Sequence, residues 1–252
     1  MTKVEDYRHR LRQLEVWDAF LLEESGLPGP RGNLELARAV ADEGDETLFH
    51  RYRALDAGSA PTNDPHEFLA FCGVLGLGRL LAESAAEGAL RADLLAELRR
   101  HAADPRWRLR EAVAQALQWL GRADMEALLA EMEAWAQRQP LEQRAAAAAV
   151  CEPALLAEAQ HARQVLDLLD RITATIPGVV DRRDDGFRAL RKALGYCWSV
   201  AAVALPAEGL ARMEAWFSSP DPDVAWILRQ NLQKKRLARL DPAWVARWTL
   251  AR

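Results

Sequence analysis

The chain has 252 residues, of which 50% are hydrophobic and 28% charged, so it can bury a large core without disulfides or a structural metal. This composition excludes a disordered, collagenous or disulfide-stapled protein. The start lacks the basic and apolar stretches of a signal peptide, and no window approaches eighteen consecutive apolar residues. We therefore expect a cytoplasmic protein with no membrane partner.

Charge is distributed unevenly along the chain. The formal net charge is -4, but residues 1–103, 104–180 and 181–252 carry balances of -6, -3 and +5. Phosphate contacts depend on the local potential and not on the overall charge. The C-terminal third is therefore where a polyanion-binding surface is expected.

The N-terminal stretch 1–32 predicts a capping helix followed by a turn. One amphipathic face is formed by Leu11, Leu14, Trp17, Phe20 and Leu21. The segment 25–32, with three glycines and two prolines, then ends the helix.

The remainder, 33–252, is predicted to be helical throughout. Helices are expected around 48–55 and 67–81, separated by a loose segment at 56–64, and apolar residues continue at helical spacing through 90–135. The best strand candidate, 172–180, is broken by Pro177 and Gly178, so a connecting loop is expected there. The fold class is all-α.

Two series of residues indicate a repeat of about 40 residues. Asp-Pro pairs, each suited to an aspartate N-cap followed by proline in the first helical turn, occur at Asp64, Asp104, Asp221 and Asp241. Segments with an apolar residue before arginine end at Arg110, Arg144, Arg191 and Arg229. Repeats of this length are typical of HEAT-like helix pairs. We expect one domain, an α-α superhelix of five to six stacked pairs.

No motif for metal, cofactor or hydrolase chemistry is present. The five histidines form no ligand pair, and Gly73, Gly76 and Gly78 lie in an apolar helical run without the lysine of a phosphate-binding loop. These glycines favour close helix packing instead. His66-Glu67 after Asp64 fits a capping box. No metal and no cofactor are expected.

The segment 229–239 contains five basic residues and no acid, and five of the nine tryptophans lie in the basic third. Aromatic and basic side chains together can hold phosphates and stack on bases. Arg229, Lys234, Lys235 and Arg236 are therefore candidate nucleic-acid contacts. The alternative is a solvated helix end whose cations offset the helix dipole, and tryptophans that belong to the core.

Three segments resemble the HEAT-like-repeat DNA-alkylation-repair glycosylases. Residues 187–198 are similar to the family's Arg-Lys-Ala-Ile-Gly-Trp segment, 141–150 to its Trp-x-Arg-Arg-x-Ala helix, and 63–67 to the His-Glu that opens an earlier helix. The resemblance implies a concave face that binds DNA around a modified base with aromatic side chains, an acid and an arginine.

Position by position, the resemblance places Arg144 at the family's arginine and Tyr196 at its cleft tryptophan. The family's Trp-Asp-x-x-Asp segment is matched only by Trp107-Arg-Leu-Arg-Glu111, which has Arg108 where an aspartate belongs. Glu111 is the candidate catalytic acid, and its structural alternative is pairing with neighbours such as Arg108.

These observations predict a non-catalytic HEAT-like repeat protein whose concave surface binds a macromolecule, either duplex DNA or a protein. The alternative is a DNA-alkylation-repair glycosylase or damaged-DNA-binding protein, in which Trp107 and Tyr196 lie against the distorted nucleotide and Arg144, Arg191 and Arg229 contact phosphates. A small-molecule enzyme has no motif in its favour. The sequence leaves open whether the repeated arginines are free or paired with Asp104, Asp221 and Asp223.

Overall fold

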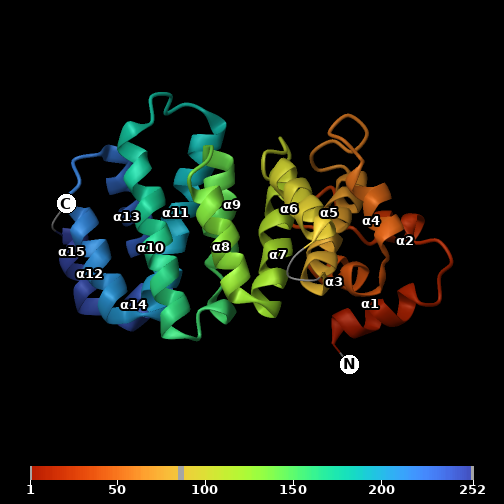
Figure 1. Ribbon diagram of the computed structural model, residues 1–252, viewed down its shortest axis with the longest axis horizontal. Helices are drawn as coiled ribbons and strands as arrows, with labels where there is room; N and C mark the ends of the chain where they lie inside the picture. The colour runs from red at the N-terminus through yellow and green to blue at the C-terminus, as the bar shows by residue number, and fades with distance from the viewer. Residues whose placement is uncertain (1, 85–87, 251–252) are drawn as a thin grey trace. The chain divides into compact units, whose positions relative to one another are not determined.

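The computed structural model describes residues 2–84 and 88–250 (Figure 1). Within these residues it contains fifteen α-helices, two 3-10 helices and no strand, so the all-α prediction is confirmed. Contacts divide the chain into two compact units, Met1–Ala123 and Asp124–Arg252. No helix of the described part is long and apolar enough to cross a membrane.

Seven α-helices form the N-terminal unit. They are α1 (Lys3–Leu11), α2 (Asp18–Glu23), α3 (Leu34–Glu43), α4 (Glu46–Arg53), α5 (Pro65–Glu83), α6 (Ala89–Ala102) and α7 (Trp107–Ala123). The long helix α5 lies at the centre, where it contacts α2, α3, α4, α6 and α7. Its consecutive buried residues explain why no single apolar face is evident in its sequence.

Glycines let neighbouring helices approach α5 closely. A Cβ atom at Gly76 would lie 2.2 Å from the Phe49 ring of α4, and one at Gly78 would lie 2.4 Å from the Ala116 Cα of α7. Real Cβ atoms do not tolerate these distances, so larger residues would push the helices apart. The prediction that this glycine run serves helix packing is confirmed.

The predicted single helix across 11–21 is wrong. Helix α1 ends at Leu11 and α2 begins only at Asp18. The Trp17 indole N–H donates to the Leu11 carbonyl at 3.0 Å, and the Arg12 side chain, at the C-cap of α1, pairs with Glu43. These tertiary contacts satisfy the exposed end of α1 and outweigh the local helical spacing.

Three of the four Asp-Pro pairs begin helices as predicted, and the prediction is wrong for Asp104, because α7 begins only at Trp107. Asp64, Asp221 and Asp241 each accept a hydrogen bond from a backbone N–H two or three residues later, at the starts of α5, α13 and α15. Asp104 accepts from the N–H group of Arg106 at 2.8 Å in the turn just before α7. These bonds satisfy donors that a helix leaves unpaired at its start.

The C-terminal unit contains eight α-helices and two 3-10 helices. The α-helices are α8 (Met125–Ala136), α9 (Pro140–Val150), α10 (Ala159–Thr175), α11 (Asp185–Ala204), α12 (Pro206–Phe217), α13 (Pro222–Leu232), α14 (Lys235–Leu240) and α15 (Pro242–Leu250). The 3-10 helices are η1 (Pro153–Leu155) and η2 (Ile176–Gly178). The segment 172–180 contains no strand: its first residues finish α10, and η2 and a loop follow.

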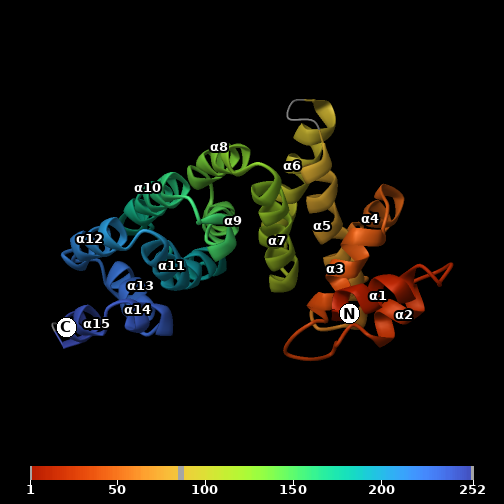
Figure 2. The same ribbon diagram turned by 90° about the horizontal axis from the view of Figure 1, so that it is seen from below.

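Helices of the C-terminal unit alternate between two layers. Helices α9, α11 and α13 contact one another in succession, and α8, α10 and α12 pack against them as a second row (Figure 2). The buried Asn231 of α13 links two inner helices, since its amide donates to the Leu194 carbonyl and its oxygen accepts from the Ser199 N–H group, both at 2.8 Å. The segments ending at Arg144, Arg191 and Arg229 thus lie on successive helices of one layer.

Candidate functional site

The predicted basic segment folds into two helices and not one. Arg229 lies in the last turn of α13, and Lys234 and Lys235 stand at the start of α14. A cation offsets the helix dipole at a C-terminus, whereas at an N-terminus it adds to the positive end. The helix-dipole alternative therefore accounts for Arg229 but not for Lys234 or Lys235.

An exposed aromatic ring lies against two of the predicted cations, Lys234 and Arg236. Tyr196 of α11 is 44% exposed. The Arg236 guanidinium carbon lies 4.5 Å and the Lys234 Nζ atom 5.7 Å from the centre of its ring, and Arg236 also donates to the Tyr196 hydroxyl. Helix α14 packs on α11, which brings these residues together. We name Tyr196, Arg229, Lys234, Lys235 and Arg236 the Tyr196 cluster.

Most arginines of the C-terminal unit outside the Tyr196 cluster are paired with carboxylates. In residues 124–250 the cations that pair with a carboxylate include Arg138, Arg163, Arg171, Arg182, Arg188, Arg191, Arg212 and Arg247. None of the four cations of the Tyr196 cluster has a carboxylate within ion-pair distance among the residues that the structure describes. Their positive charge is therefore available to an external anion.

Two other predicted arginines are placed differently. Arg144 of α9 is only 8% exposed. Arg191 of α11 bonds Asp223 and lies 4.4 Å from the centre of the Trp226 ring. For Arg191 the structure thus realises the aspartate-paired alternative, and pairing with a bound phosphate would require it to leave Asp223.

Arg182 completes this network beside α13. Its guanidinium donates to Asp221 at 2.7 Å and to Asp223 at 2.6 Å. The hydrogen bonds from Arg182 hold the pKa of Asp221 below its usual value. Burial raises the pKa of Asp223, but hydrogen bonds from Arg182 and Arg191 outweigh this effect and lower it. Both carboxylates are therefore charged at neutral pH and hold the two arginines in place.

The five late tryptophans serve the structure of the C-terminal unit. Four of them donate their indole N–H: Trp198 to Thr173, Trp216 to Asp170, and Trp244 and Trp248 to Glu214. Trp226 lies beneath Arg191. Trp198 and Trp244 are buried, so the core alternative holds for these two, whereas the other three are partly exposed.

The N-terminal unit holds the other predicted residues, Trp107 and Glu111, at a cavity of about 230 Å³. Trp107 is 44% exposed and opens α7, and both side chains line the same cavity. Arg108 is buried and bonds Glu67 of α5 at 3.0 Å. The carboxylate that neutralises Arg108 here is thus Glu67, from a different helix.

The capping prediction for Glu67 missed this buried ion pair. Asp64 caps α5, and Glu67 accepts from the Asn63 N–H group at 2.7 Å, which is close to the predicted capping box. Glu67 is also fully buried, and the pairing with Arg108 joins residues 41 positions apart. The only sequence signal for this ion pair is an arginine at a position of α7 that faces the core, because a buried arginine needs a carboxylate partner.

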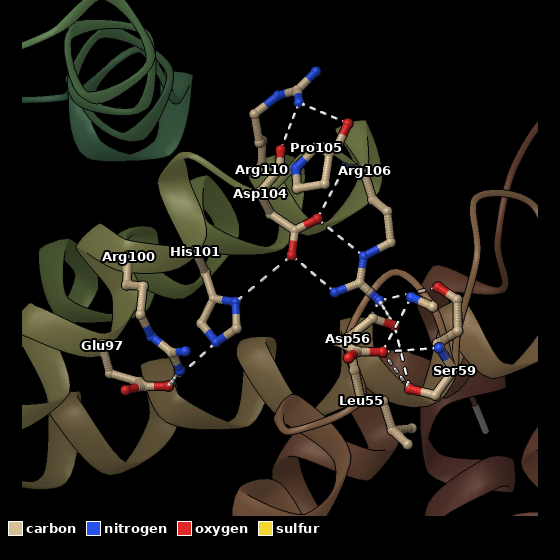
Figure 3. A network of polar contacts seen from close by, with 12 residues as sticks. Leu55, Asp56, Ser59, Glu97, Arg100, His101, Asp104, Pro105, Arg106 and Arg110 are labelled. Carbon is tan, nitrogen blue, oxygen red and sulfur yellow. Dashed lines mark hydrogen bonds and ion pairs between the residues drawn. The ribbon is translucent and has the colours of Figure 1, made fainter.

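A second polar network holds the loop before α5 against the start of α7 (Figure 3). The buried Arg106 donates to Asp104 at 2.8 Å and to the backbone carbonyls of Leu55, Asp56 and Ala60. This arginine therefore anchors the loop that the sequence predicted to be loose.

His101 lies on the other side of Asp104 in the same network. Its Nδ1 atom lies 4.0 Å from Asp104, and its Nε2 atom lies 3.3 Å from Glu97 (Figure 3). Among the described residues, including those of this network, no group of three His, Cys, Asp or Glu side chains has an arrangement that could hold a metal ion. Its geometry is that of a structural hydrogen-bond network.

Comparisons with known proteins add no family. No family model matches the chain, and no curated protein matches it. A crystal structure of an engineered protein from the Northeast Structural Genomics Consortium is similar over 95% of this chain and 98% of its own, with 14% identity and a TM-score of 0.34. Functional inference therefore rests on the residues of this chain.

Proposed function

We propose that the chain is a non-catalytic binding protein of HEAT-like helix pairs whose C-terminal unit binds duplex DNA through the Tyr196 cluster. The observation that carries the proposal is a set of four cations without a carboxylate partner in 229–236, of which Lys234 and Arg236 lie against the exposed Tyr196 ring, while Asp221 and Asp223 are bound to other arginines. Cations that are not paired with a carboxylate release counterions from DNA when they contact phosphates, which drives binding that is independent of sequence.

The exposure of these side chains supports contacts between the Tyr196 cluster and the phosphate backbone of DNA. Arg229 and Lys235 are exposed, and Lys234 and Arg236 are held partly exposed beside the Tyr196 ring. An arginine placed by an aromatic ring loses less side-chain entropy when it binds a phosphate. Arg144 and Arg191 are not needed for this binding, because one is buried and the other bonds Asp223.

The test is fluorescence anisotropy of a labelled duplex at low salt with matched charge variants. Lys234→Ala and Arg236→Ala should each weaken binding several-fold. The control is Arg163→Ala, which removes an exposed cation of α10 that pairs with Glu208 at 2.6 Å and should leave the affinity unchanged. Equal affinity for all four proteins would contradict the proposal, and no binding by the wild type would point to a protein partner.

The repair alternative is favoured by one observation, the position of Trp107 and Glu111 on a shared cavity. A glycosylase would release an alkylated base from duplex DNA, and Glu111→Gln would abolish that release while Gln115→Glu, on the same cavity, would not. The proposed non-catalytic function predicts no base release by the wild type. Release that depends on Glu111 would replace it with the repair function.

A further inference from the structure

A hollow on the N-terminal unit is lined by exposed apolar side chains. It measures about 480 Å³ and lies between the turn after α1 and the start of α4. Leu14 and Val16, which both line it, are 39% and 69% exposed. Single exposed apolar side chains are common in proteins, but two that share one hollow form a patch. Apolar patches with a polar rim mark contacts with other molecules.

Ion pairs hold the walls of this hollow in place. Glu43 accepts hydrogen bonds from Arg8 at 2.5 Å and from Arg12 at 2.6 Å, which ties α1 and the turn after it to α3. Arg51 donates from both terminal nitrogens to Asp18 at 2.8 Å, which ties α4 to α2. A surface that is already formed loses little conformational entropy when a partner binds, so this hollow is suited to binding as it stands.

The two turns around the hollow are acidic. Segments 13–18 and 42–48 contain six acidic residues and no lysine or arginine. Three of these acids pair with arginines outside the two segments, namely Asp18, Asp42 and Glu43. Half of the negative charge is therefore neutralised within the unit.

The other three acids have no lysine or arginine partner in the described part of the chain. Glu15 is exposed on the lining of the hollow. Asp45, also on the lining, caps α4 by accepting from the Leu48 N–H group at 2.7 Å, which leaves its carboxylate without a counter-ion. Glu46, next in the chain, lies 3.3 Å from His50. The hollow thus combines an apolar surface with negative charge that the described lysines and arginines leave unpaired.

These properties select a segment of another protein as the occupant. Val16 is 69% exposed, so the hollow is too open to bury most of a small ligand's surface, as small-molecule sites do. The carboxylates of Glu15 and Asp45 repel nucleic acids and attract lysine and arginine side chains. No three His, Cys, Asp or Glu side chains among the described residues are placed to hold a metal ion. A basic peptide segment with apolar side chains meets both the charge and the apolar surface.

We propose that this hollow is a docking site for a segment of another protein in which leucine or similar side chains are flanked by lysines or arginines. Its residues all belong to the N-terminal unit. The proposal does not depend on the function proposed for the Tyr196 cluster.

The test uses three labelled peptides and fluorescence anisotropy with the full chain at low salt. Repeats of Lys-Leu, Lys-Ser and Glu-Leu supply a basic apolar, a basic polar and an acidic apolar peptide of equal length. The basic apolar peptide should bind at least about tenfold more tightly than the basic polar one, because only its leucines bury apolar surface. The acidic peptide should not bind. Equal affinities of the two basic peptides, or no binding of the basic apolar one, would overturn the proposal.

Matched variants of exposed side chains locate the peptide. Val16→Ser should weaken binding about fivefold, whereas Val180→Ser, at a valine that is 97% exposed in the C-terminal unit, should not. Glu15→Lys should weaken binding about fivefold, whereas Glu158→Lys, the same change at an exposed glutamate of the C-terminal unit, should not. Equal effects of the two members of either pair would overturn the docking site.

Two further measurements separate this site from other surfaces. Lys234→Ala, which tests the Tyr196 cluster, should bind the basic apolar peptide as the wild type does, so the two proposals can fail independently. Loss of peptide binding in this variant would overturn the proposal. Sedimentation velocity should give the same oligomeric state for the wild type and Val16→Ser. A wild-type dimer that Val16→Ser dissociates would assign the hollow to a second copy of the chain and would overturn the proposal as well.

Discussion

The ion pair between Glu67 and Arg108 gives the sharpest prediction about stability. Glu67 is fully buried and the Arg108 side chain is 7% exposed, and the two are joined at 3.0 Å. Glu67→Gln keeps the volume and an acceptor for the Asn63 N–H group but removes the negative charge. The buried Arg108 guanidinium is then left without its counter-ion.

The expected loss is about 3 kcal/mol of the free energy of unfolding. Removing one partner of a buried ion pair costs about 3–5 kcal/mol. The lower value applies because Arg108 keeps its bond to the Gly29 carbonyl at 2.6 Å and its contact with the Trp107 ring at 4.5 Å. These remaining contacts offset part of the burial cost of the unpaired charge.

The assay is urea unfolding followed by circular dichroism at pH 7. The control is Glu35→Gln, which breaks an exposed ion pair between Glu35 in α3 and Arg31 in the loop before it. It should lower the free energy of unfolding by at most about 0.5 kcal/mol. The double variant Glu67→Gln/Arg108→Met should be more stable than Glu67→Gln alone, because it removes the stranded charge. A loss for Glu67→Gln no larger than that for Glu35→Gln would refute this reasoning.

Three further predictions concern other buried contacts. Asn231→Ala should lower the free energy of unfolding by about 2 kcal/mol in urea, because it strands backbone groups of α11, and a loss below about 0.5 kcal/mol would contradict that role. Gly78→Ala should destabilise the chain by more than about 2 kcal/mol, whereas Gly178→Ala should be nearly neutral, and equal thermal midpoints would contradict the packing given for α5. Burial raises the pKa of Asp104, but hydrogen bonds from Arg106 and other neighbours outweigh this effect and hold the pKa well below its usual range. The charged Asp104 therefore contributes its full stabilisation above about pH 4, and this is lost as the pH falls further. Asp104→Asn should make the free energy of unfolding fall less steeply between about pH 4 and pH 2, and an unchanged pH dependence would count against the Arg106 contact.

Local signals in the sequence predicted the helices well. Asp64 and Asp221 cap helices where an aspartate precedes proline, and the apolar spacing placed the helices that follow. Capping and periodicity act over one or two turns, so the residues that determine them lie next to each other in the chain. The break between α1 and α2 was missed because Trp17 and Glu43 supply it through tertiary contacts.

The candidate site depended on long-range partners, and there the sequence was less informative. Whether Arg191 was free or paired could not be decided until α13 brought Asp223 to it, 32 residues away. The carboxylate that neutralises Arg108 lies 41 residues earlier. Tyr196 and Arg236 were each predicted as contacts from separate signals, but their packing against each other results from the turn between α13 and α14. Residue type indicated the chemistry, and tertiary structure selected the partners.

The central claim, that the Tyr196 cluster binds DNA phosphates, is tested most directly by the salt dependence of duplex binding. Four phosphate contacts predict a slope of about -3.6 for the logarithm of the association constant against the logarithm of the salt concentration, or about a hundredfold loss between about 50 and 200 mM. In Lys234→Ala/Lys235→Ala/Arg236→Ala the slope should fall to about -1. A wild-type slope near zero, or an unchanged slope in the triple variant, would contradict the account.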